Sequence, residues 1–338
     1  MDIREALGAV VEQRDLTTAE MQSVMMQIMT GQATDSQMGA FLMGLRMKGE
    51  SVKEIAGAAR VMRELAIPVS IATENAVDIV GTGGDSANLF NVSTACAIVV
   101  AAAGGTVAKH GNRSVSSTTG SADLLEALGV NLNLEPAQVA RCIDEIGVGF
   151  MFAPQHHKAM RHAITPRKEM GLRTIFNLLG PLTNPAGAKH YLLGVFEPSY
   201  CLPIAQVMQE LGAKHAMVVS AADGLDEISL HGETFVAELK DNEITEYKLT
   251  AAKAGLEPQS LDGLQVFSAA ESLQMINAAF SGEHSKAVDM IALNAGAALY
   301  AADIAPDLVS AVAKAKETIL SGAALNKMRQ LADFSNSI

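Results

Sequence analysis

The N-terminal part of the chain places apolar side chains at helical spacing, and this pattern predicts four helices before Pro68. Two of these helices begin with a capping box, in which a hydroxyl residue is followed three positions later by a glutamate. The pairs are Thr17 with Glu20 and Ser51 with Glu54. Because each pair satisfies backbone N–H groups that a helix start leaves unbonded, we expect helices to begin at both places.

From residue 77 onward, short apolar runs alternate with stretches of helical spacing. The runs predict strands at residues 77–80, 106–108, 148–153, 191–196 and 216–220. The helical stretches between most of them cover residues 91–103, 122–128, 136–146 and 199–211. Strands that alternate with helices form a largely parallel sheet, and loops at the carboxyl ends of its strands line the ligand crevice. Further along, the pattern predicts a hairpin at 234–239 and 244–249 and helices from about Ala269.

The pattern therefore predicts an α/β protein with two domains. One is a small α-helical domain at residues 1–72. The other is a large α/β domain with a mostly parallel central sheet and C-terminal helices, at residues 73–165 and 191–338. The intervening segment 166–190 is rich in proline and polar residues, so we expect it to pack on the helical domain rather than form a simple crossover.

Two loops rich in glycine and hydroxyl residues follow the first two predicted strands. The first contains Gly81, Thr82, Gly83, Gly84, Asp85 and Ser86, and leads to a helix start with Asn91, Ser93 and Thr94. The second contains Lys109, His110, Gly111, Asn112 and Arg113, and leads through hydroxyl residues to a helix near Ser121. Glycines let a backbone approach a ligand, and helix N-termini offer N–H groups and a positive dipole end. Since Lys109, His110 and Arg113 can also be cationic, we expect the two loops to bind phosphate or pyrophosphate.

Each loop taken alone also allows a plainer interpretation. The first could be a tight strand-to-helix turn, because Ser86 stands where the dinucleotide-binding fingerprint has glycine or alanine, and no Walker A motif occurs. The second could be a charged surface turn. Other chemistries have no support, since the sequence contains neither an H-E-x-x-H zinc motif nor a G-x-S-x-G nucleophile elbow.

Adjacent carboxylates at Asp226 and Glu227 follow the fifth predicted strand, close to Gly224. Such a pair can hold Mg²⁺ through one or two contacts while substrate phosphates and water complete the coordination. An isolated acidic pair is also common on protein surfaces. The metal interpretation therefore depends on the phosphate loops.

Composition and charge narrow the possible partners. Hydrophobic residues make up 49% of the chain and charged residues 18%, which is typical of a globular protein. The formal net charge of −12 argues against a nucleic-acid or anionic-membrane binder, which would normally carry a basic excess. An acidic protein that binds a phosphorylated ligand needs local cations and a divalent metal to offset repulsion.

The cysteines and the N-terminus bear on the compartment. Cys96, Cys142 and Cys201 are odd in number and far apart, which favours free thiols in a reducing cytosol over a disulfide framework or a zinc site. The N-terminus lacks an apolar core of signal-peptide length, and the most apolar run is too short to span a bilayer. We therefore expect a cytoplasmic protein.

Taken together, several motifs closely resemble the anthranilate phosphoribosyltransferase family, which shares its fold group with the pyrimidine nucleoside phosphorylases. They are GTGGD, NVST, KHGNR, SSTTGSAD, RKEMGLRTIFNLLGPLTNP and GLDE, in the family's order along nearly the whole chain. The resemblance implies transfer of phosphoribose from phosphoribosyl pyrophosphate (PRPP) to the amine of anthranilate, with Mg²⁺ required and pyrophosphate released. It also implies a homodimer formed through the helical domain. The sequence departs from the family at Thr118-Thr119, where Lys-Ser or Ser-Ser is common in the family. This difference removes at most one contact to a phosphate.

The resemblance also implies residue roles, carried over by motif. The residues implied for PRPP are Gly81, Thr82, Gly83, Gly84, Asp85, Ser86, Asn91, Ser93, Thr94, Lys109, Ser117 and Ser121. Those implied for anthranilate are Gly81, His110, Asn112, His157, Arg167 and Gly180, with Arg167 facing the carboxylate. Those implied for the metal are Ser93, Asp226 and Glu227. No covalent nucleophile is expected, and His110 is the one candidate for a proton role.

Two other hypotheses remain at this stage. A nucleoside phosphorylase of the same fold would cleave thymidine or uridine with phosphate, although the KHGNR and FNLLGPLTNP motifs argue against it. A nucleic-acid-binding module of similar fold would need a basic groove, which the net charge of −12 disfavours.

Overall fold

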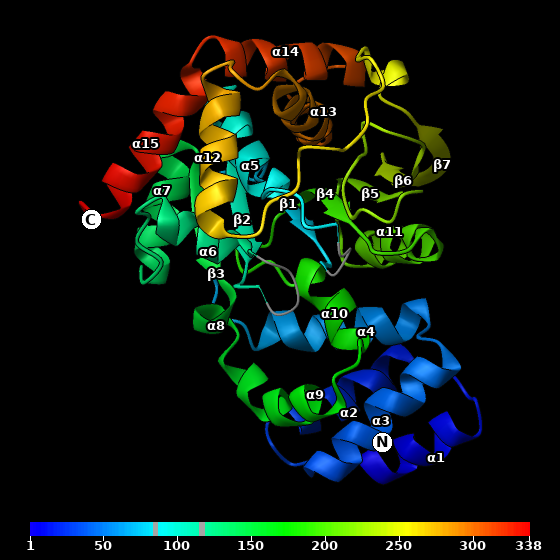
Figure 1. Ribbon diagram of the computed structural model, residues 1–338. Coiled ribbons are helices and arrows are strands. Elements are labelled where there is room, and N and C mark those ends of the chain that lie inside the picture. The colour runs from blue at the N-terminus through cyan, green and yellow to red at the C-terminus, as the bar shows by residue number, and fades with distance from the viewer. Residues whose placement is uncertain (84–86, 115–118) are drawn as a thin grey trace.

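The computed structural model describes residues 1–83, 87–114 and 119–338. A small helical bundle that contains the N-terminus lies below a larger α/β body, and the chain ends at the left side of that larger body (Figure 1). Within the described residues, no helix combines the length and the apolar character that a bilayer span requires.

The helical bundle confirms the four predicted helices. They are α1 (Ile3–Val11), α2 (Thr18–Met29), α3 (Asp35–Lys48) and α4 (Val52–Glu64). Both predicted capping boxes are present, at Thr17 and at Ser51. The structure adds two more, at Asp2 before α1 and at Thr34 before α3.

The α/β body contains a seven-stranded sheet with the order β3-β2-β1-β4-β5-β6-β7. The strands are β1 (Val77–Gly81), β2 (Val107–Gly111), β3 (Val148–Phe152), β4 (His190–Gly194), β5 (His215–Ala221), β6 (Thr234–Lys240) and β7 (Glu243–Leu249). The first five are parallel, and β6 and β7 form the predicted antiparallel hairpin at one edge. The prediction ended the second strand at residue 108, which is wrong. That strand continues to Gly111, since Lys109 and His110 pair with Phe150 and Met151 of β3, and both side chains are buried there.

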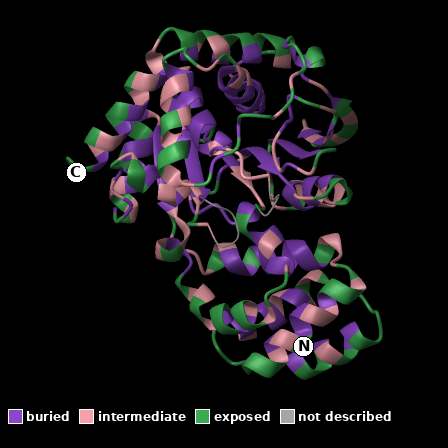
Figure 2. Cartoon of the chain, in the orientation of Figure 1, coloured by how far each residue is buried: buried purple, intermediate pink, exposed green. Residues whose placement is uncertain are grey.

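Helices cover both faces of this sheet. In the α/β body they are α5 (Val92–Ala102), α6 (Ser121–Ala127), α7 (Pro136–Ile146), α11 (Cys201–Glu210), α12 (Ala269–Phe280), α13 (Ser285–Ala301), α14 (Leu308–Leu320) and α15 (Ala323–Ser335). Along β4, Leu192 packs with α5 and α13 in one core, whereas Tyr191 and Leu193 belong to a second core shared with the helical bundle. The buried central strands and α13 are visible in Figure 2. Burial on both faces explains why the parallel strands read as nearly continuous apolar runs.

The chain visits the helical bundle a second time between β3 and β4. This excursion contains α8 (Ala153–His156), α9 (Ile164–Met170) and α10 (Ile175–Leu179). Helix α9 packs on α3, and α10 packs on α3 and α4. The excursion places Arg167 and Gly180 near the narrow region between the helical bundle and the α/β body, which we call the waist (Figure 1). The domain boundaries at 72 and 165 stay predictions.

Candidate active site

The strand order reverses between β1 and β4, and the carboxyl ends of these two strands carry the first candidate residues. In open α/β sheets this is where ligands bind. Strand β1 ends at Gly81 and β4 ends at Gly194, and both glycines face Asp226, which follows β5. A Cβ on Gly194 would overlap the carbonyl of Asp226, and a Cβ on Gly81 would overlap its carboxylate. The glycines are therefore needed for Asp226 to approach the strand ends.

Asp226 also binds the first glycine loop directly. The backbone N–H of Gly83 donates a hydrogen bond of 2.6 Å to Oδ2 of Asp226. Nearby, the hydroxyl of Thr82 accepts a hydrogen bond of 3.1 Å from the N–H of Phe196. The structure thus joins the predicted glycine loop and one member of the predicted metal pair, although they are far apart in the sequence.

Lys109 lies at the same edge, almost entirely buried. Its ammonium donates to the carbonyl of Ile79 (2.6 Å) and to the hydroxyl of Ser93 (3.3 Å) in the first turn of α5. Burial lowers the pKa of Lys109, and the nearby carboxylates of Asp78, Glu227 and Asp226 oppose that shift. The structure therefore gathers Lys109, Ser93, Asp226 and Glu227, all four of which are predicted site residues.

Asn91, immediately before α5, connects the two predicted loops. Its Nδ2 donates to the carbonyl of Thr119 (3.3 Å), and its Oδ1 accepts from the hydroxyl of Ser272 (2.8 Å). Ser272 is fully buried in α12 and also accepts a hydrogen bond of 3.0 Å from the N–H of Asn91. Sequence reasoning missed Ser272, because nothing in the local pattern of α12 indicates a contact with a residue so distant in the chain.

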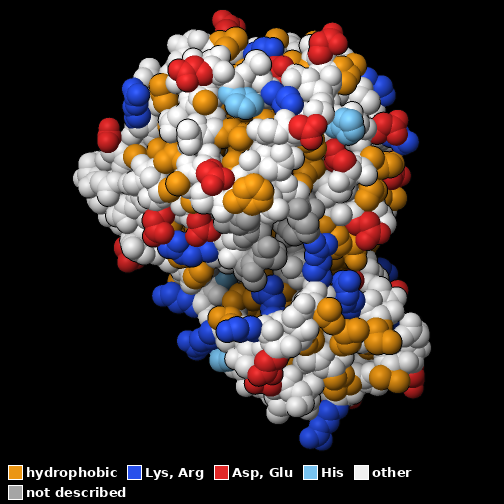
Figure 3. Space-filling view, in the orientation of Figure 1, with side chains coloured by type: hydrophobic (Ala, Val, Ile, Leu, Met, Phe, Trp, Pro, Cys, Tyr) orange, Lys and Arg blue, Asp and Glu red, His pale blue; other side chains and the backbone are white. Residues whose placement is uncertain are grey.

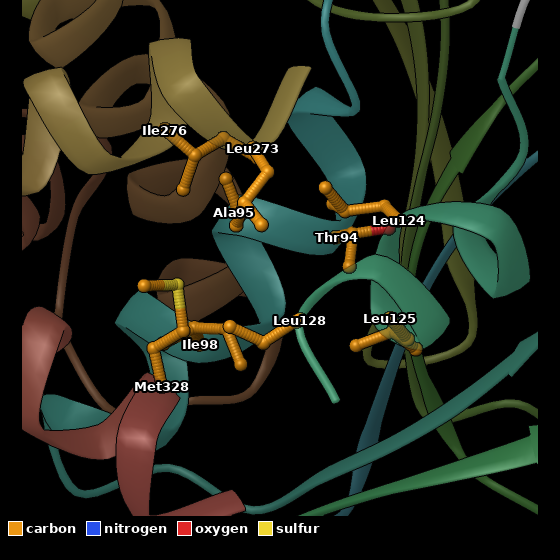
Figure 4. Close-up of a pocket in the computed structure, with 9 residues that line it drawn as sticks. All are labelled: Thr94, Ala95, Ile98, Leu124, Leu125, Leu128, Leu273, Ile276 and Met328. Carbon is orange, nitrogen blue, oxygen red and sulfur yellow. The ribbon is translucent and has the colours of Figure 1, made fainter. Parts of the chain in front are cut away.

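Thr94 is placed differently from its neighbour Ser93. Its side chain is buried and lines a small apolar cavity with Ile98, Leu124 and Met328, among α5, α6 and α15 (Figure 4). Among the described residues its hydroxyl has no hydrogen-bond partner. The structure does not bring the Thr94 side chain to Lys109, so only its backbone N–H remains in the first turn of α5.

Two histidines form a buried pair beside Lys109. The ring centroids of His110 and His157 are 5.0 Å apart. Burial, reinforced by neighbouring histidines, lowers the pKa of His110 well below its usual value and that of His157 to about 4. Both imidazoles are thus neutral at pH 7. The carbonyl of Gly180 lies near His110, so three of the residues implied for anthranilate come together.

The other residues of the second loop contact neighbouring protein groups more than the sequence predicts. The guanidinium of Arg113 pairs with Asp123 (3.1 Å) and Glu126 (2.7 Å) and lies 5.7 Å from the ring centroid of Phe152. The expectation that Arg113 supplies charge for an anion is therefore wrong, because two carboxylates already neutralise it. Asn112 and Ser121 contact one another, since the Ser121 hydroxyl donates to the Asn112 carbonyl over 3.3 Å.

Arg167 lies in α9, on the helical side of the waist. Its guanidinium lies 5.0 Å from the ring centroid of Phe176, and burial lowers its pKa. No acidic side chain in the described parts of the chain forms an ion pair with it. Lys and Arg side chains gather along this waist in the surface view (Figure 3). The remaining predicted residues, Gly84, Asp85, Ser86 and Ser117, lie outside the described residues.

The fold and this edge of the sheet define a two-domain α/β protein with a cationic, glycine-lined site next to two carboxylates. Comparison with known families agrees with that class. Residues 4–66 match the helical bundle domain of the glycosyl transferase family, and residues 73–325 match its a/b domain.

Relatives with nearly the same length narrow the class. A protein of Hahella chejuensis named anthranilate phosphoribosyltransferase is 62% identical over 99% of this chain and 98% of its own length. The Marinobacter nauticus protein of that name is 59% identical over 99% of both chains. The chain belongs to the glycosyl transferase family and, within it, to the anthranilate phosphoribosyltransferases.

Solved structures of that name share the whole fold. The anthranilate phosphoribosyltransferase of Thermus thermophilus superposes with a TM-score of 0.93 at 42% identity, covering 98% of this chain and 99% of its own. The Saccharomyces cerevisiae structure in complex with PRPP and Mg has a TM-score of 0.91 at 25% identity, covering 99% and 98%.

Proposed function

We propose that the residues gathered at the carboxyl edge of the sheet transfer the 5-phosphoribosyl group of PRPP to the amine of anthranilate. The bond between ribose C1 and pyrophosphate breaks, and its electron pair leaves with the pyrophosphate. A bond forms between C1 and the anthranilate nitrogen, which loses a proton. The observation that carries this proposal is the buried Lys109 beside Ser93, Asp226 and Glu227, in a chain whose relatives are named for this reaction.

PRPP would lie between the glycine loop and the start of α5. Gly81 and Gly83 let the backbone approach the pyrophosphate, and the first turn of α5 offers N–H groups at Ser93 and Thr94. Lys109 would place its charge on a phosphate oxygen, stabilising the negative charge that develops on the departing pyrophosphate. The further contacts implied for Thr82, Asn91 and Ser121 belong to the same proposal.

The donor set at this edge suits Mg²⁺. It offers two adjacent carboxylates, those of Asp226 and Glu227, with the hydroxyl of Ser93, which are hard oxygen ligands. In residues 1–83, 87–114 and 119–338 no three His, Cys, Asp or Glu side chains gather as a metal cage, which suits an ion that completes its coordination with phosphates and water. When bound, Mg²⁺ would supply positive charge for the diphosphate.

Anthranilate would lie against the neutral histidine pair. His110 and His157 present uncharged rings to an aromatic substrate, with the carbonyl of Gly180 near His110, and the contact implied for Asn112 belongs to the same proposal. Arg167, which lacks an acidic partner in the described residues, would bind the carboxylate in a charge-assisted contact. Aligning the amine with C1 supplies much of the rate by proximity. His110 remains the candidate for a proton role, although its lowered pKa makes it a weak base.

Anthranilate fluorescence gives a direct test of this activity. Purified protein with PRPP and Mg²⁺ should remove the fluorescence of added anthranilate, and omission of PRPP should preserve it. Phosphorolysis of thymidine or uridine without loss of anthranilate would instead indicate the nucleoside phosphorylase alternative, and a DNA gel shift at moderate salt would favour the nucleic-acid-binding alternative.

We also propose a cytoplasmic homodimer formed through the helical bundle. Val11 at the end of α1 is 79% exposed and Met47 near the end of α3 is 73% exposed, which suits a covered apolar face. Val11→Glu with Met47→Glu should shift the mass in light scattering from dimer to monomer. The matched control Val309→Glu changes an exposed valine on α14 and should leave a dimer; equal effects of both changes would contradict this interface.

The three free, buried cysteines suit the reducing compartment that the proposed cytoplasmic location implies.

A further inference from the structure

Strands β1 and β2 separate just where the candidate site begins. Strand β1 pairs with β4 from Val77 to Gly81, and β2 pairs with β3 from Val107 to Gly111. Between β1 and β2, both of which the structure describes in full, the only paired residues are Val77 and Val107. The two strands that lead into the glycine loop and into Lys109 therefore diverge in the middle of the sheet.

Side chains satisfy the backbone groups along this gap. Oδ1 of Asp78 accepts from the N–H of His110 (3.1 Å), and Nδ2 of Asn184 donates to the carbonyl of Ala108 (2.8 Å). Across the same gap, the Lys109 ammonium donates to the carbonyl of Ile79. In a regular parallel pair these groups would bond to the neighbouring strand. The hydrogen bonds of these three side chains therefore replace the missing backbone pairing between β1 and β2.

Asp78 is the centre of this arrangement. Its side chain is fully buried, and its Oδ2 accepts a hydrogen bond of 2.7 Å from Nδ2 of Asn184. Burial raises its pKa to about 6, against the opposing influence of Lys109 and Asn184. Burying a carboxylate is costly, and replacing buried charged groups by well-packed apolar ones is often neutral or stabilising. Its presence in a central strand therefore calls for a reason other than stability.

Asn184 extends the arrangement to the helical side. It lies in the return from α10 to β4, and its Oδ1 accepts a hydrogen bond of 2.9 Å from the N–H of Ala186. The adjacent Pro185 accepts from the N–H of Val69 (3.0 Å), which lies in the first connection between the two parts. Asp78 thus links β1, the end of β2 and the segment that follows Gly180.

We propose that Asp78 and Asn184 are positioning residues that hold β1 and β2 apart and thereby set the places of Lys109 and His110 at the ligand edge. This inference rests on the proposed binding of PRPP by Lys109. Both side chains act through their neighbours, because each is buried beneath the edge and bonds to protein groups that carry the strand ends.

A double-mutant cycle between Asp78 and Lys109 tests the proposal. Asp78→Asn keeps an oxygen that accepts from the His110 N–H. It places a second NH₂ group opposite the Asn184 NH₂ group, so the hydrogen bond between the two side chains is lost. We expect KM for PRPP to rise about tenfold, in the range of coupling between residues of one electrostatic and hydrogen-bond network. In a Lys109→Ala background the same change should add less than about twofold, because the group that it positions is already gone.

Glu54→Gln is the matched control. Glu54 is another fully buried carboxylate, which accepts from the N–H groups of Leu16 (2.9 Å) and Ser51 (2.8 Å) in the helical bundle. It should lower the unfolding midpoint in urea while leaving KM for PRPP unchanged. An Asp78→Asn protein that loses stability without a change in KM, or a full tenfold rise in the Lys109→Ala background, would overturn the proposal.

The proposed PRPP contact and the positioning role fail in different ways. If Lys109→Ala alone leaves KM for PRPP unchanged, the assigned contact of Lys109 is wrong. If Lys109→Ala raises KM and Asp78→Asn does not, the contact holds and the positioning role is wrong. Should Asp78→Asn not fold, Asn184→Ser replaces it in the same cycle, since it keeps the Asp78 carboxylate and removes the Asn184 amide that donates to Asp78 and to the carbonyl of Ala108.

Discussion

Gly81→Ala is the sharpest probe of the proposed metal site. The backbone at Gly81 is part of β1 and is not in the left-handed region, so alanine fits its conformation. The new Cβ would, however, overlap the carboxylate of Asp226, whose Cγ would lie only 2.9 Å away. The Asp226 side chain must therefore rotate, and its hydrogen bond from the Gly83 N–H at 2.6 Å is lost.

The size of the effect follows from that hydrogen bond. A hydrogen bond to a charged group contributes about 1.5–3 kcal/mol. If Asp226 holds Mg²⁺ only in its present orientation, losing that orientation weakens Mg²⁺ binding by roughly 10- to 150-fold. The assay is the initial rate of anthranilate fluorescence loss against Mg²⁺ concentration, with both substrates saturating. The Mg²⁺ concentration for half-maximal rate should rise accordingly, and the melting temperature should fall by a few degrees because the same hydrogen bond also stabilises the fold.

Gly149→Ala is the control for crowding in a strand. Its Cβ would lie 2.6 Å from Cγ1 of Ile143 and 2.9 Å from the carbonyl of Val139, within the packing of β3 on α7. It should lower stability and leave the Mg²⁺ response unchanged. An unchanged Mg²⁺ response in Gly81→Ala, or the same shift in both variants, would refute the assignment of Asp226 to the metal.

Three further predictions concern the remaining charged groups. Arg167→Ala should raise KM for anthranilate by roughly tenfold or more, as for a lost charge-assisted hydrogen bond, and leave KM for PRPP unchanged; Lys168→Ala is the control, and a parallel rise for both substrates would contradict it. Because the pKa of His157 is lowered to about 4, the unfolded state binds the extra proton between about pH 6.5 and 4, so stability falls with falling pH. His157→Gln should make the urea midpoint of unfolding depend less on pH between about pH 6.5 and 4. An unaltered slope of midpoint against pH would argue against a neutral buried His157. The carboxylate of Glu238 lies 3.0 Å from Nε2 of His215 and accepts a hydrogen bond of 2.8 Å from the hydroxyl of Tyr247, so Glu238→Gln, which replaces hydrogen bonds to a charged group by neutral ones, should lower the free energy of unfolding by roughly 1–2 kcal/mol; no loss in urea titration would count against these contacts.

Much of the fold and the site was predictable because the signals are local. Capping boxes at Thr17 and Ser51 depend on residues three positions apart, and strand and helix periods are visible within one element. Lys109 and Asp226 could be assigned to one place because Lys109 lies near the carboxyl end of one parallel strand and Asp226 follows another, and the carboxyl ends of such strands share one edge. For these residues, position along a strand was nearly sufficient to predict position in space.

Side-chain pairing could not be predicted in the same way. Arg113 looked like a free cation, but its partners Asp123 and Glu126 lie on the next helix and are brought near only by the turn of the chain. Ser272 bonds to Asn91 from a helix far along the sequence. Whether a charged side chain is available to a ligand depends on such tertiary contacts, and the spacing of apolar and polar residues along the chain does not predict them.

Asp78 shows where a local signal was present and passed unnoticed. The first strand reads Val-Asp-Ile-Val, and its apolar residues alone suffice to predict a strand there. A parallel strand covered on both faces should be apolar throughout, so one carboxylate within it breaks the local rule. Such conflicts between local preference and position are expected at functional or strained sites. Here the conflict coincides with the gap between β1 and β2, which argues that the opening of the sheet, as much as the glycine loops, prepares this edge for its ligand.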